Sequence, residues 1–299
     1  MKQALYQFIY HPFVNKILRN INKFLSLVLP DSVRIPPAGT LAVKLKSSQF
    51  KFVTNQTNKT SQLLFWNGPY TVEYTSIFED LIKNCTCYYD IGAHAGYYSI
   101  LAATVNPNIK VIAFEPASGP FYYLNKNIEA NHLIDRVKPF ALAIGNEVGK
   151  VEFLEATHSK YTYLMHNLIA VSNLNIEQPG RSMKKITVEI STLDHFIEKQ
   201  KEPWPDIIKM DTEGTEHLIL KGATEVLKRK PIIISETLFK TNEEPLEGIM
   251  RQNGYQFFNY LAGKLHPVPT LFRESDNGVH DCFFVHPEKY HLIQKYLTN

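Results

Sequence analysis

The 299-residue sequence contains no apolar run long enough to cross a membrane. Residues 1–29 are rich in leucine, isoleucine and phenylalanine, but Lys16, Arg19 and Lys23 interrupt them. A membrane span needs about 20 apolar residues in succession. The segment also lacks the basic start, apolar middle and small-residue cleavage site of a signal peptide. We therefore expect a cytoplasmic protein without a transmembrane segment.

Cysteine is scarce, with only Cys85, Cys87 and Cys282 in the whole sequence. An odd number of cysteines, two of them separated by one residue, matches neither a disulfide framework nor a common zinc spacing. Free thiols fit a reducing compartment such as the cytoplasm. We expect all three to be small core residues.

Neither sign of charge is in large excess. The sequence has 32 lysines and arginines against 29 acidic residues, a formal net charge of +3. So small a net charge gives little support to the idea that nucleic acid or a membrane is the main partner. With 44% hydrophobic and 20% charged residues, the composition is that of a globular protein with a core. The length suits one large α/β domain with an extension.

Residues 1–72 are expected to form that extension. Residues 1–29 have the pattern of an amphipathic helix, and residues 41–57 alternate as a small hairpin does. The helix could pack on the main domain, which is the simpler interpretation. It could also lie on a membrane surface, peripheral to the bilayer, or bind a partner.

Residues 73–299 alternate regularly between strands and helices. Apolar strands are expected at residues 87–91, 110–114, 136–143, 206–210 and 231–235. Helices are expected at 97–105, 120–131, 193–199 and 215–228. Continuous apolar strands that alternate with helices indicate a mostly parallel sheet covered on both faces. The sequence therefore predicts a doubly wound, Rossmann-like α/β domain.

A glycine-rich turn follows the first of these strands, with Asp90 before Gly92 and Gly96 before the next helix. Glycines permit a tight turn and let the backbone approach a ligand, which would lie at the carboxyl end of the strand. Glu115 ends the next strand, where a carboxylate can accept both ribose hydroxyls of a nucleoside.

The residues of this turn distinguish between two nucleoside cofactors. A dinucleotide requires G-x-G-x-x-G, and His94 stands where the middle glycine would be, which disfavours a nicotinamide-dependent oxidoreductase. Asp90 suits the cationic amino-acid end of S-adenosylmethionine, whereas a pyrophosphate would gain nothing from a carboxylate. The turn, the acid and the strand–helix context together favour S-adenosylmethionine.

A second group of acids follows the strand at residues 206–210. Asp211 and Glu213 lie on the same edge of the predicted sheet as Asp90 and Glu115, and Glu236 lies just past the following strand. These acids could simply cap a helix and favour its dipole. That explanation accounts poorly for carboxylates that gather where such sheets bind ligands.

Five motifs occur in a fixed order: YDIGAHAGY at 89–97, AFEP at 113–116, DIIKMDTEGTE at 206–216, LKGA at 220–223 and PIIISE at 231–236. With Thr192-Leu193-Asp194, this set resembles the FkbM family of methyltransferases over roughly residues 73–260. The resemblance implies the class I methyltransferase fold and methylation of a hydroxyl group of a sugar or natural product. The sequence departs at His94, where the family usually has asparagine. Both side chains tolerate a left-handed backbone, so we expect the turn to be kept.

The resemblance also implies roles for individual residues. The methionine end of the cofactor would be held by Asp90, Gly92, Ala93, His94 and Gly96. Glu115, with Pro116, would bind the ribose, and the end of the third strand around Ala143 would flank the adenine. Asp211 would lie close enough to contact the cofactor as well.

Asp211 and Glu213 would face the methyl group and the acceptor. An attacking hydroxyl needs its proton drawn away, so a base or a metal is expected there. Asp211 is the preferred base, and His94 and His217 are alternatives. A divalent cation such as Mg²⁺ on Asp211 and Glu236 is the other option, because such cations take hard oxygen ligands.

Residues 155–185 are expected to form a long irregular loop inserted in the domain. It contains Tyr161, Tyr163 and His166, whose rings could stack on the face of a sugar. Long irregular segments are often lids or binding loops. The same rings could equally pin the loop to the core.

The sequence thus predicts an S-adenosylmethionine-dependent O-methyltransferase acting on a carbohydrate or glycosylated metabolite. The acceptor would be a small molecule or glycan and not a nucleic acid, and a homo-oligomer stays open. The alternatives are an NAD-dependent oxidoreductase and a catalytically inactive methyltransferase fold used as a binding module. The intact acids at Asp90, Glu115, Asp211 and Glu213 argue against an inactive copy.

Overall fold

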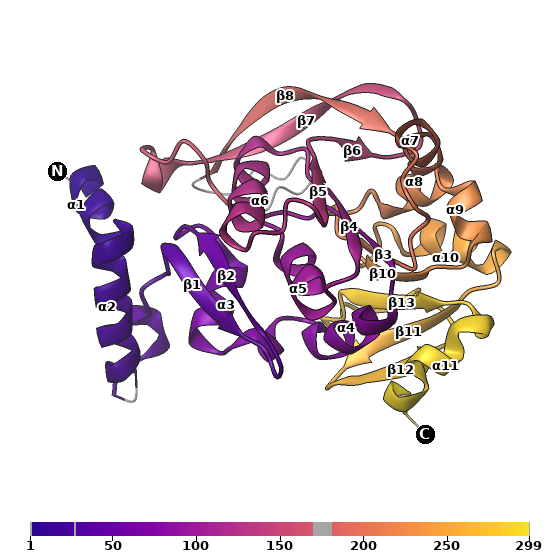
Figure 1. The fold of residues 1–299 in the computed structure, drawn as a ribbon, viewed down its shortest axis with the longest axis horizontal. Helices are drawn as coiled ribbons and strands as arrows, with labels where there is room; N and C mark the ends of the chain where they lie inside the picture. Colours follow the sequence, from indigo (N-terminus) through magenta and orange to yellow (C-terminus); the bar gives the residue numbers. More distant parts are fainter. Residues whose placement is uncertain (1, 27, 170–180, 299) are drawn as a thin grey trace.

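A computed structural model describes residues 2–26, 28–169 and 181–298 (Figure 1). Its central element is an eight-stranded sheet in the order β12–β11–β13–β10–β9–β3–β4–β5. The neighbouring strands β5, β4, β3, β9 and β10 pair in parallel. Strand β13 pairs antiparallel with both β10 and β11, and β11 pairs antiparallel with β12. The order β5–β4–β3–β9–β10 is the 3-2-1-4-5 order of doubly wound folds. The predicted α/β fold class is confirmed.

The parallel strands are buried on both faces of the sheet, except for the edge strand β5, where Lys138 is exposed and Pro139 and Phe140 are half-buried. They are β3 (Cys87–Ile91), β4 (Lys110–Phe114), β5 (Val137–Phe140), β9 (Ile207–Met210) and β10 (Ile232–Glu236). Since successive side chains point to opposite faces, Tyr88 belongs to one hydrophobic core and Tyr89 to the other. Two buried faces explain why these strands read as continuous apolar runs.

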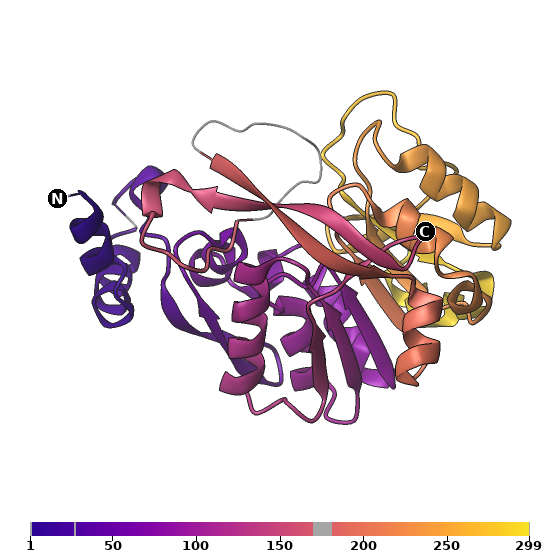
Figure 2. The ribbon, with the colours of Figure 1, turned by 90° about the horizontal axis from the view of Figure 1, so that it is seen from above.

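Helices cover each face of the sheet (Figures 1 and 2). One layer contains α4 (Thr75–Leu81), α5 (Tyr97–Val105) and α6 (Ser118–Ala130). The other contains α7 (Leu193–Gln200), α8 (Glu216–Lys221), α9 (Thr224–Lys228) and α10 (Glu243–Gln252). The carboxyl-terminal part of the main domain contains β11 (Gln256–Leu261), β12 (Lys264–Val268), β13 (Asp281–Val285) and α11 (Tyr290–Ile293).

The amino-terminal extension consists of two helices, a hairpin and a third helix. These are α1 (Lys2–Ile9), α2 (Pro12–Leu25), β1 (Gly39–Lys44), β2 (Gln49–Thr54) and α3 (Lys59–Trp66). The hairpin lies between α2 and the helices of the main domain (Figure 1). Asn127 of α6 accepts a hydrogen bond from the amide of Val53 at 2.5 Å and donates to its carbonyl at 3.1 Å. Asn131 likewise accepts from the amide of Lys51 and donates to its carbonyl. These side-chain amides therefore fix the hairpin to α6.

A small three-stranded sheet contains β6 (Ala143–Ile144), β7 (Gly149–His158) and β8 (Arg181–Ser191). Strands β7 and β8 form a long antiparallel ribbon that crosses over the main domain (Figure 2). The prediction of an irregular loop at 155–185 is therefore wrong at both ends, where Glu155 pairs with Lys184 and His158 with Arg181. Most of the described ribbon lies at the surface, so it lacks the continuous apolar pattern that marks a buried strand. Residues 170–180 of that predicted loop lie outside the described residues.

Other differences concern the boundaries of elements. The predicted strand 136–143 is split between β5 and β6, and the predicted helix 215–228 between α8 and α9. At that second break, a Cβ on Gly222 would lie 2.3 Å from the carbonyl oxygen of Gly145, so only glycine fits at the end of α8. Helix α3 and strand β12 were not predicted. Within the described residues, no helix is both long and apolar enough to span a membrane.

Candidate active site

The turn between β3 and α5 has the backbone conformation that its glycines allow. Gly92, His94 and Gly96 have φ angles of +72°, +52° and +81°. This left-handed region is uncommon for residues other than glycine, and His94 adopts it as expected. The amide of Gly92 donates to the carbonyl of Phe114 at 3.0 Å. A Cβ on Gly92 would lie 1.9 Å from the carbonyl oxygen of Asp211, so the turn packs directly on the end of β9.

Asp90 lies in β3, immediately before this turn, and is buried. Its Oδ2 accepts a hydrogen bond from the hydroxyl of Ser99 at 2.5 Å. Its Oδ1 has no hydrogen-bond partner among the described residues, although Nζ of Lys209 lies 3.6 Å away. A buried carboxylate oxygen without a donor can accept a hydrogen bond from a cationic ligand group.

Glu115 ends β4 on the neighbouring strand and is also buried. Its Oε2 accepts from the amide of His94 and its Oε1 from the amide of Ala117, each at 2.8 Å. Burial raises the pKa of Glu115 to about 7, although both amides lower it. Pro116 lies between Glu115 and Ala117, just before the start of α6. Each oxygen of Glu115 keeps acceptor capacity for a ligand hydroxyl.

Lys209 is a buried cation at the centre of the site, and the sequence analysis gave it no role. Its Nζ lies 3.4 Å from Oδ2 of Asp211 and donates to the carbonyl of Gly92 at 3.2 Å. Burial lowers the pKa of Lys209, but Asp211, Asp90 and Glu73 outweigh it, so the pKa lies above its ordinary value. The overlooked signal was a lysine inside a four-residue strand that is otherwise apolar.

The loop after β9 is shaped by Glu216 at the start of α8. This buried carboxylate accepts from the amide of Thr212 at 2.8 Å and from the amide of Gly214 at 3.1 Å. Asn242 donates to Oε2 of Glu216, the oxygen that also accepts from Gly214. Glu213, inside the loop, has a φ of +58°, which a non-glycine residue adopts at a cost in strain. Glu216 therefore holds Asp211 and Glu213 in place at the edge of the sheet.

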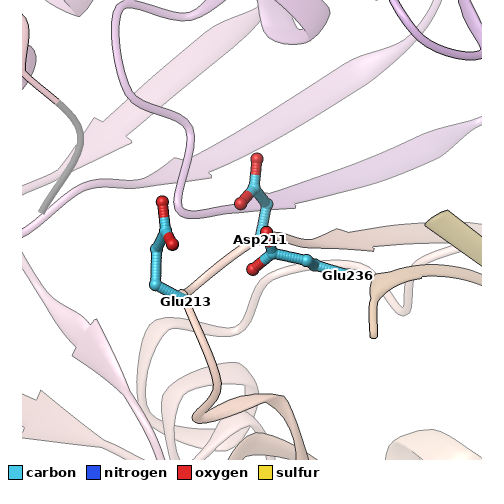
Figure 3. Close-up of side chains that lie close together, drawn as sticks. All are labelled: Asp211, Glu213 and Glu236. Carbon is cyan, nitrogen blue, oxygen red and sulfur yellow. The ribbon is translucent and has the colours of Figure 1, made fainter. Parts of the chain in front are cut away.

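Three carboxylates converge beyond the ends of β9 and β10 (Figure 3). One oxygen of each of Asp211, Glu213 and Glu236 lies within 4.8 Å of those of the other two. Burial, together with repulsion from Asp211, Glu213, Glu216 and Asp281, raises the pKa of Glu236. The Oε2 atom of Glu236 has no hydrogen-bond partner among the described residues. The structure thus brings together the acids that the sequence analysis grouped, with Asp281 opposite Glu236 as a neighbour that it missed.

The two candidate histidines lie in different surroundings. Burial lowers the pKa of His94 to about 4, although Asp211 and a backbone hydrogen bond with Leu168 oppose this. Its ring is therefore neutral near pH 7, and its Nε2 has no partner among the described residues. His217 lies on α8 and is half-buried, and burial and Lys221 lower its pKa.

A pocket with a cavity of about 50 Å³ lies against the glycine turn. The main domain contributes Gly92, Ala93, His94, Lys209 and Asp211 to its lining. The amino-terminal extension contributes Phe52, Thr60 and Val72, and Glu73 follows directly. Glu73, at φ +38°, accepts a hydrogen bond from the hydroxyl of Tyr98 at 3.0 Å. The extension thus covers the turn, a role that the sequence analysis did not foresee.

A larger cavity of about 470 Å³ lies between the start of α6 and the β7–β8 ribbon. Tyr161 and His166 line it, whereas Tyr163 does not. Tyr161 is buried, with its ring edge-on to Tyr6 at 5.4 Å. His166 stacks on Tyr122 at a ring distance of 4.1 Å. Of the three predicted acceptor residues, His166 is therefore the one with a ring stacked at this cavity.

Ala143 does not lie where the sequence analysis expected it. The third strand of the main sheet, β5, ends at Phe140, and the amide of Glu115 donates to the carbonyl of Phe140 at 3.0 Å. Ala143 belongs to β6 and pairs with Ile190 of β8. The residue beside Glu115 at the end of that strand is therefore Phe140.

Comparison with known proteins adds to this geometry. Residues 90–257 match the model of the methyltransferase FkbM domain. The chain belongs to the FkbM methyltransferase family. The matched residues of this methyltransferase domain include the glycine turn, Glu115, Asp211 and Glu236.

Two characterised relatives are similar to part of the methyltransferase domain. Hexuronic acid methyltransferase AglP of Haloferax volcanii is 25% identical over 148 residues, which cover 50% of this chain and 54% of that protein. Methyltransferase sdnD of Sordaria araneosa is 23% identical over 157 residues, covering 46% of this chain and 60% of that protein. The matches thus span little more than half the length of these relatives.

Solved structures of methyltransferases are similar to the chain at low sequence identity. Precorrin-6y C5,15-methyltransferase of Geobacter metallireducens is 12% identical with a TM-score of 0.44, covering 79% of this chain and 94% of that one. The methyltransferase domain of METTL16 is 18% identical with a TM-score of 0.42, covering 71% and 66%. Family membership and the strand order of the sheet confirm the class I methyltransferase fold.

Proposed function

We propose that the protein is an S-adenosylmethionine-dependent O-methyltransferase that acts on a hydroxyl group of a carbohydrate or glycosylated metabolite. The observation that carries the proposal is the position of Asp211. It follows β9 and lies against the glycine turn of β3, where the strand order of the sheet reverses. Ligands of doubly wound folds bind at this point.

The residues around the turn fit S-adenosylmethionine. The Oδ1 of Asp90 lies 3.6 Å from Nζ of Lys209 but accepts no hydrogen bond within the described residues, so it suits the ammonium group of a methionine moiety. Gly92, Ala93 and His94 line the small pocket at the turn, and Gly96 follows them at the start of α5. Glu115, followed by Pro116, can accept ribose hydroxyls. When bound, the cofactor would supply a methyl group made electrophilic by a positively charged sulfur.

Asp211 would act as the general base in this proposal. Its side chain is 42% exposed, so an acceptor can reach it, whereas Asp90 and Glu115 are buried. The attacking hydroxyl would pass its proton to Asp211 as its oxygen forms the new bond to carbon and the sulfur–carbon bond breaks. Lys209 would hold the carboxylate in position from the inner side. Glu213 and the neutral ring of His94 are the other proton acceptors near this position.

The acceptor would enter through the cavity under the ribbon. Its lining includes His166, whose ring stacks on Tyr122, and the charged groups of Glu155 and Lys184. Aromatic faces beside charged groups suit a sugar ring with polar substituents. The name of the archaeal relative, a hexuronic acid methyltransferase, favours a carbohydrate acceptor, and the family favours methyl transfer over oxidation by NAD.

A bound divalent cation is a second component that one observation favours. The oxygens of Asp211, Glu213 and Glu236 lie within 4.8 Å of one another. Opposite ligands are about 4.6–5.2 Å apart across Ca²⁺ and about 4.0–4.2 Å across Mg²⁺, so the limit of 4.8 Å fits the spacing around Ca²⁺ and exceeds that around Mg²⁺. A cation would relieve the repulsion among these acids and orient the acceptor oxygen. Full activity after exhaustive EDTA treatment would exclude this component.

The proposal is tested by incubating the protein with S-adenosylmethionine that carries a deuterated methyl group. The acceptor panel would include glycosides of uronic acids, glycosides of neutral hexoses, and a catechol. We expect mass spectrometry to detect labelled methyl ether on a glycoside. Calorimetry with S-adenosylhomocysteine and with NAD tests the cofactor separately. Tight binding of NAD without binding of S-adenosylhomocysteine would overturn the proposal.

A further inference from the structure

Helix α2 presents its polar side to the protein and its apolar side to solvent. Asn15, Arg19 and Asn22 are its buried residues, with exposed fractions of 0%, 4% and 8%. On the opposite side its exposed large apolar side chains include Phe13 (68%), Ile17 (47%), Ile21 (53%) and Phe24 (82%), and Lys16 and Lys23 are exposed beside them. An amphipathic helix of a soluble domain ordinarily does the reverse. The apolar side of α2 therefore lacks a partner among the described residues.

The two groups form opposite faces of one helix. At about 100° per residue, Phe13, Ile17, Ile21 and Phe24 fall within an arc of about 80°. Asn15, Arg19 and Asn22 fall within an arc of about 60° on the opposite side. The exposed side chains thus form a continuous stripe, which we call the α2 stripe.

Hydrogen bonds hold the helix in this orientation. Asn15 accepts from the amide of Ala38 at 2.7 Å and donates to the carbonyl of Pro36 at 3.1 Å. Arg19 donates to the carbonyls of Ala38 and Thr40 at 2.6 and 3.0 Å. Rotation of α2 to bury its apolar side would leave these buried groups without partners, at a considerable cost. The inverted orientation is therefore built into the fold.

Exposed apolar side chains also occur just before and just after α2. Leu5 and Phe8 of α1 are 55% and 63% exposed, and Val28, after α2, is 79% exposed. Both helices lie at one end of the molecule, away from the central sheet (Figures 1 and 2). Contiguous exposed apolar surface on a soluble protein marks an interaction site.

The charge of the extension indicates which partner covers this surface. Residues 1–72 contain nine lysines and arginines and one acid, Asp31, a balance of +8. Residues 73–299 contain 32 − 9 = 23 basic and 29 − 1 = 28 acidic residues, a balance of −5. The small whole-chain charge conceals this division. Lys16 and Lys23 flank the α2 stripe on one side, and residues 1–30 contain no acid.

We propose that the α2 stripe lies on a membrane surface that carries anionic lipids. Phenylalanine and isoleucine on one face, with lysines beside them, are typical of helices that lie in the headgroup region. Each basic residue near an anionic surface adds attraction, which salt weakens. A second copy of the chain is disfavoured as the partner, because two extensions of the same high charge would repel each other. This inference is independent of the proposed function.

Vesicle flotation tests the proposal with the full chain. Vesicles of phosphatidylcholine alone are compared with vesicles that also contain phosphatidylglycerol. We expect binding to the mixed vesicles that falls with rising salt, and weak binding to the neutral ones. The double variant Phe13→Ser, Phe24→Ser should weaken binding by about tenfold or more, since each buried phenylalanine contributes strongly. The variant Lys16→Glu should weaken binding to the mixed vesicles alone.

Matched controls separate a surface effect from loss of the fold. The double variant Ile134→Ser, Phe272→Ser removes two exposed apolar side chains of the main domain, and Lys199→Glu reverses an exposed charge there. These controls should bind vesicles as the unaltered protein does, and all variants should keep its melting temperature. Absence of binding to mixed vesicles would overturn the proposal. So would a dimer in solution that the Phe13→Ser, Phe24→Ser variant dissociates, because the stripe would then be an interface between copies.

Discussion

The ammonium group of Lys209 lies 3.4 Å from Oδ2 of Asp211, on the carboxylate that we propose as the general base. The same nitrogen lies 3.6 Å from Oδ1 of Asp90 on the neighbouring strand. One buried cation thus links an acid of the proposed cofactor site with an acid of the proposed catalytic site. Asp211 remains partly exposed, whereas Lys209 and Asp90 do not.

Replacing Lys209 with methionine should destabilise the protein. The change keeps the volume of the side chain but leaves Asp90 buried without its cation, which typically costs about 3–5 kcal/mol. The free energy of unfolding, measured with urea, checks this. Lys199→Met on the exposed end of α7 is the control and should change it by less than about 0.5 kcal/mol. Equal stability of both variants would mean that Lys209 does not compensate Asp90.

Replacing Glu115 with alanine should weaken binding of S-adenosylmethionine. The change removes a carboxylate that can accept the ribose hydroxyls, a loss on the order of 1.5–3 kcal/mol in binding free energy. Titration calorimetry with S-adenosylhomocysteine measures the difference. Glu152→Ala, on the exposed ribbon, is the control and should bind as the unaltered protein does. Unchanged affinity of the Glu115 variant would remove this residue from the cofactor site.

Glu115 should also contribute to the dependence of stability on pH. Burial raises its pKa to about 7 in the folded protein, above the ordinary value of about 4.3. The folded state therefore binds the proton more tightly, and this contribution to stability is lost as the pH rises through 7. Glu115→Gln cannot ionise. Its melting temperature relative to that of the unaltered protein should rise between pH 5 and 8, and parallel profiles would contradict this.

Replacing Gly92 with alanine should disrupt the turn. The new Cβ would lie 1.9 Å from the carbonyl oxygen of Asp211, and a φ of +72° adds strain of about 1–3 kcal/mol. We expect a lower melting temperature and loss of cofactor binding. Gly248→Ala is the matched control, because it lies in helix α10 with open space around it. There alanine should leave binding unchanged and stabilise the helix by up to about 1 kcal/mol. Normal cofactor binding by the Gly92 variant would contradict this account of the turn.

The central sheet and the acids at its edge could be predicted because each strand carries its own signal. The strands β3 and β4 have the predicted bounds, since both are mostly apolar and are followed by a glycine or an acid. The acids then had to lie at one edge, because the carboxyl ends of parallel strands meet there. Asp90, Glu115, Asp211 and Glu236 accordingly lie at the ends of four adjacent strands.

The features that were not predicted depend on contacts between segments that are distant in the sequence. Such contacts leave little local pattern in the sequence itself. The ribbon strands β7 and β8 are largely exposed, and their parts at residues 155–158 and 181–185 were interpreted as a loop. Phe52 and Thr60 line the pocket at the glycine turn. Their position depends on the hydrogen bonds of Asn127 and Asn131 with the hairpin. The importance of Lys209 became visible only with Asp90 and Asp211 beside it.

The central claim is that Asp211 removes the proton of the acceptor hydroxyl, and the variant Asp211→Asn tests it most directly. Asparagine keeps the shape of the side chain but cannot act as the base, and positioned bases typically contribute about 10²–10⁴-fold. The measurement is kcat for methyl transfer to the identified acceptor, with melting temperature and cofactor affinity recorded on the same preparation. The account predicts that kcat falls by about that factor while the other two quantities change little. A variant that turns over normally, or one that unfolds or loses the cofactor, would contradict it.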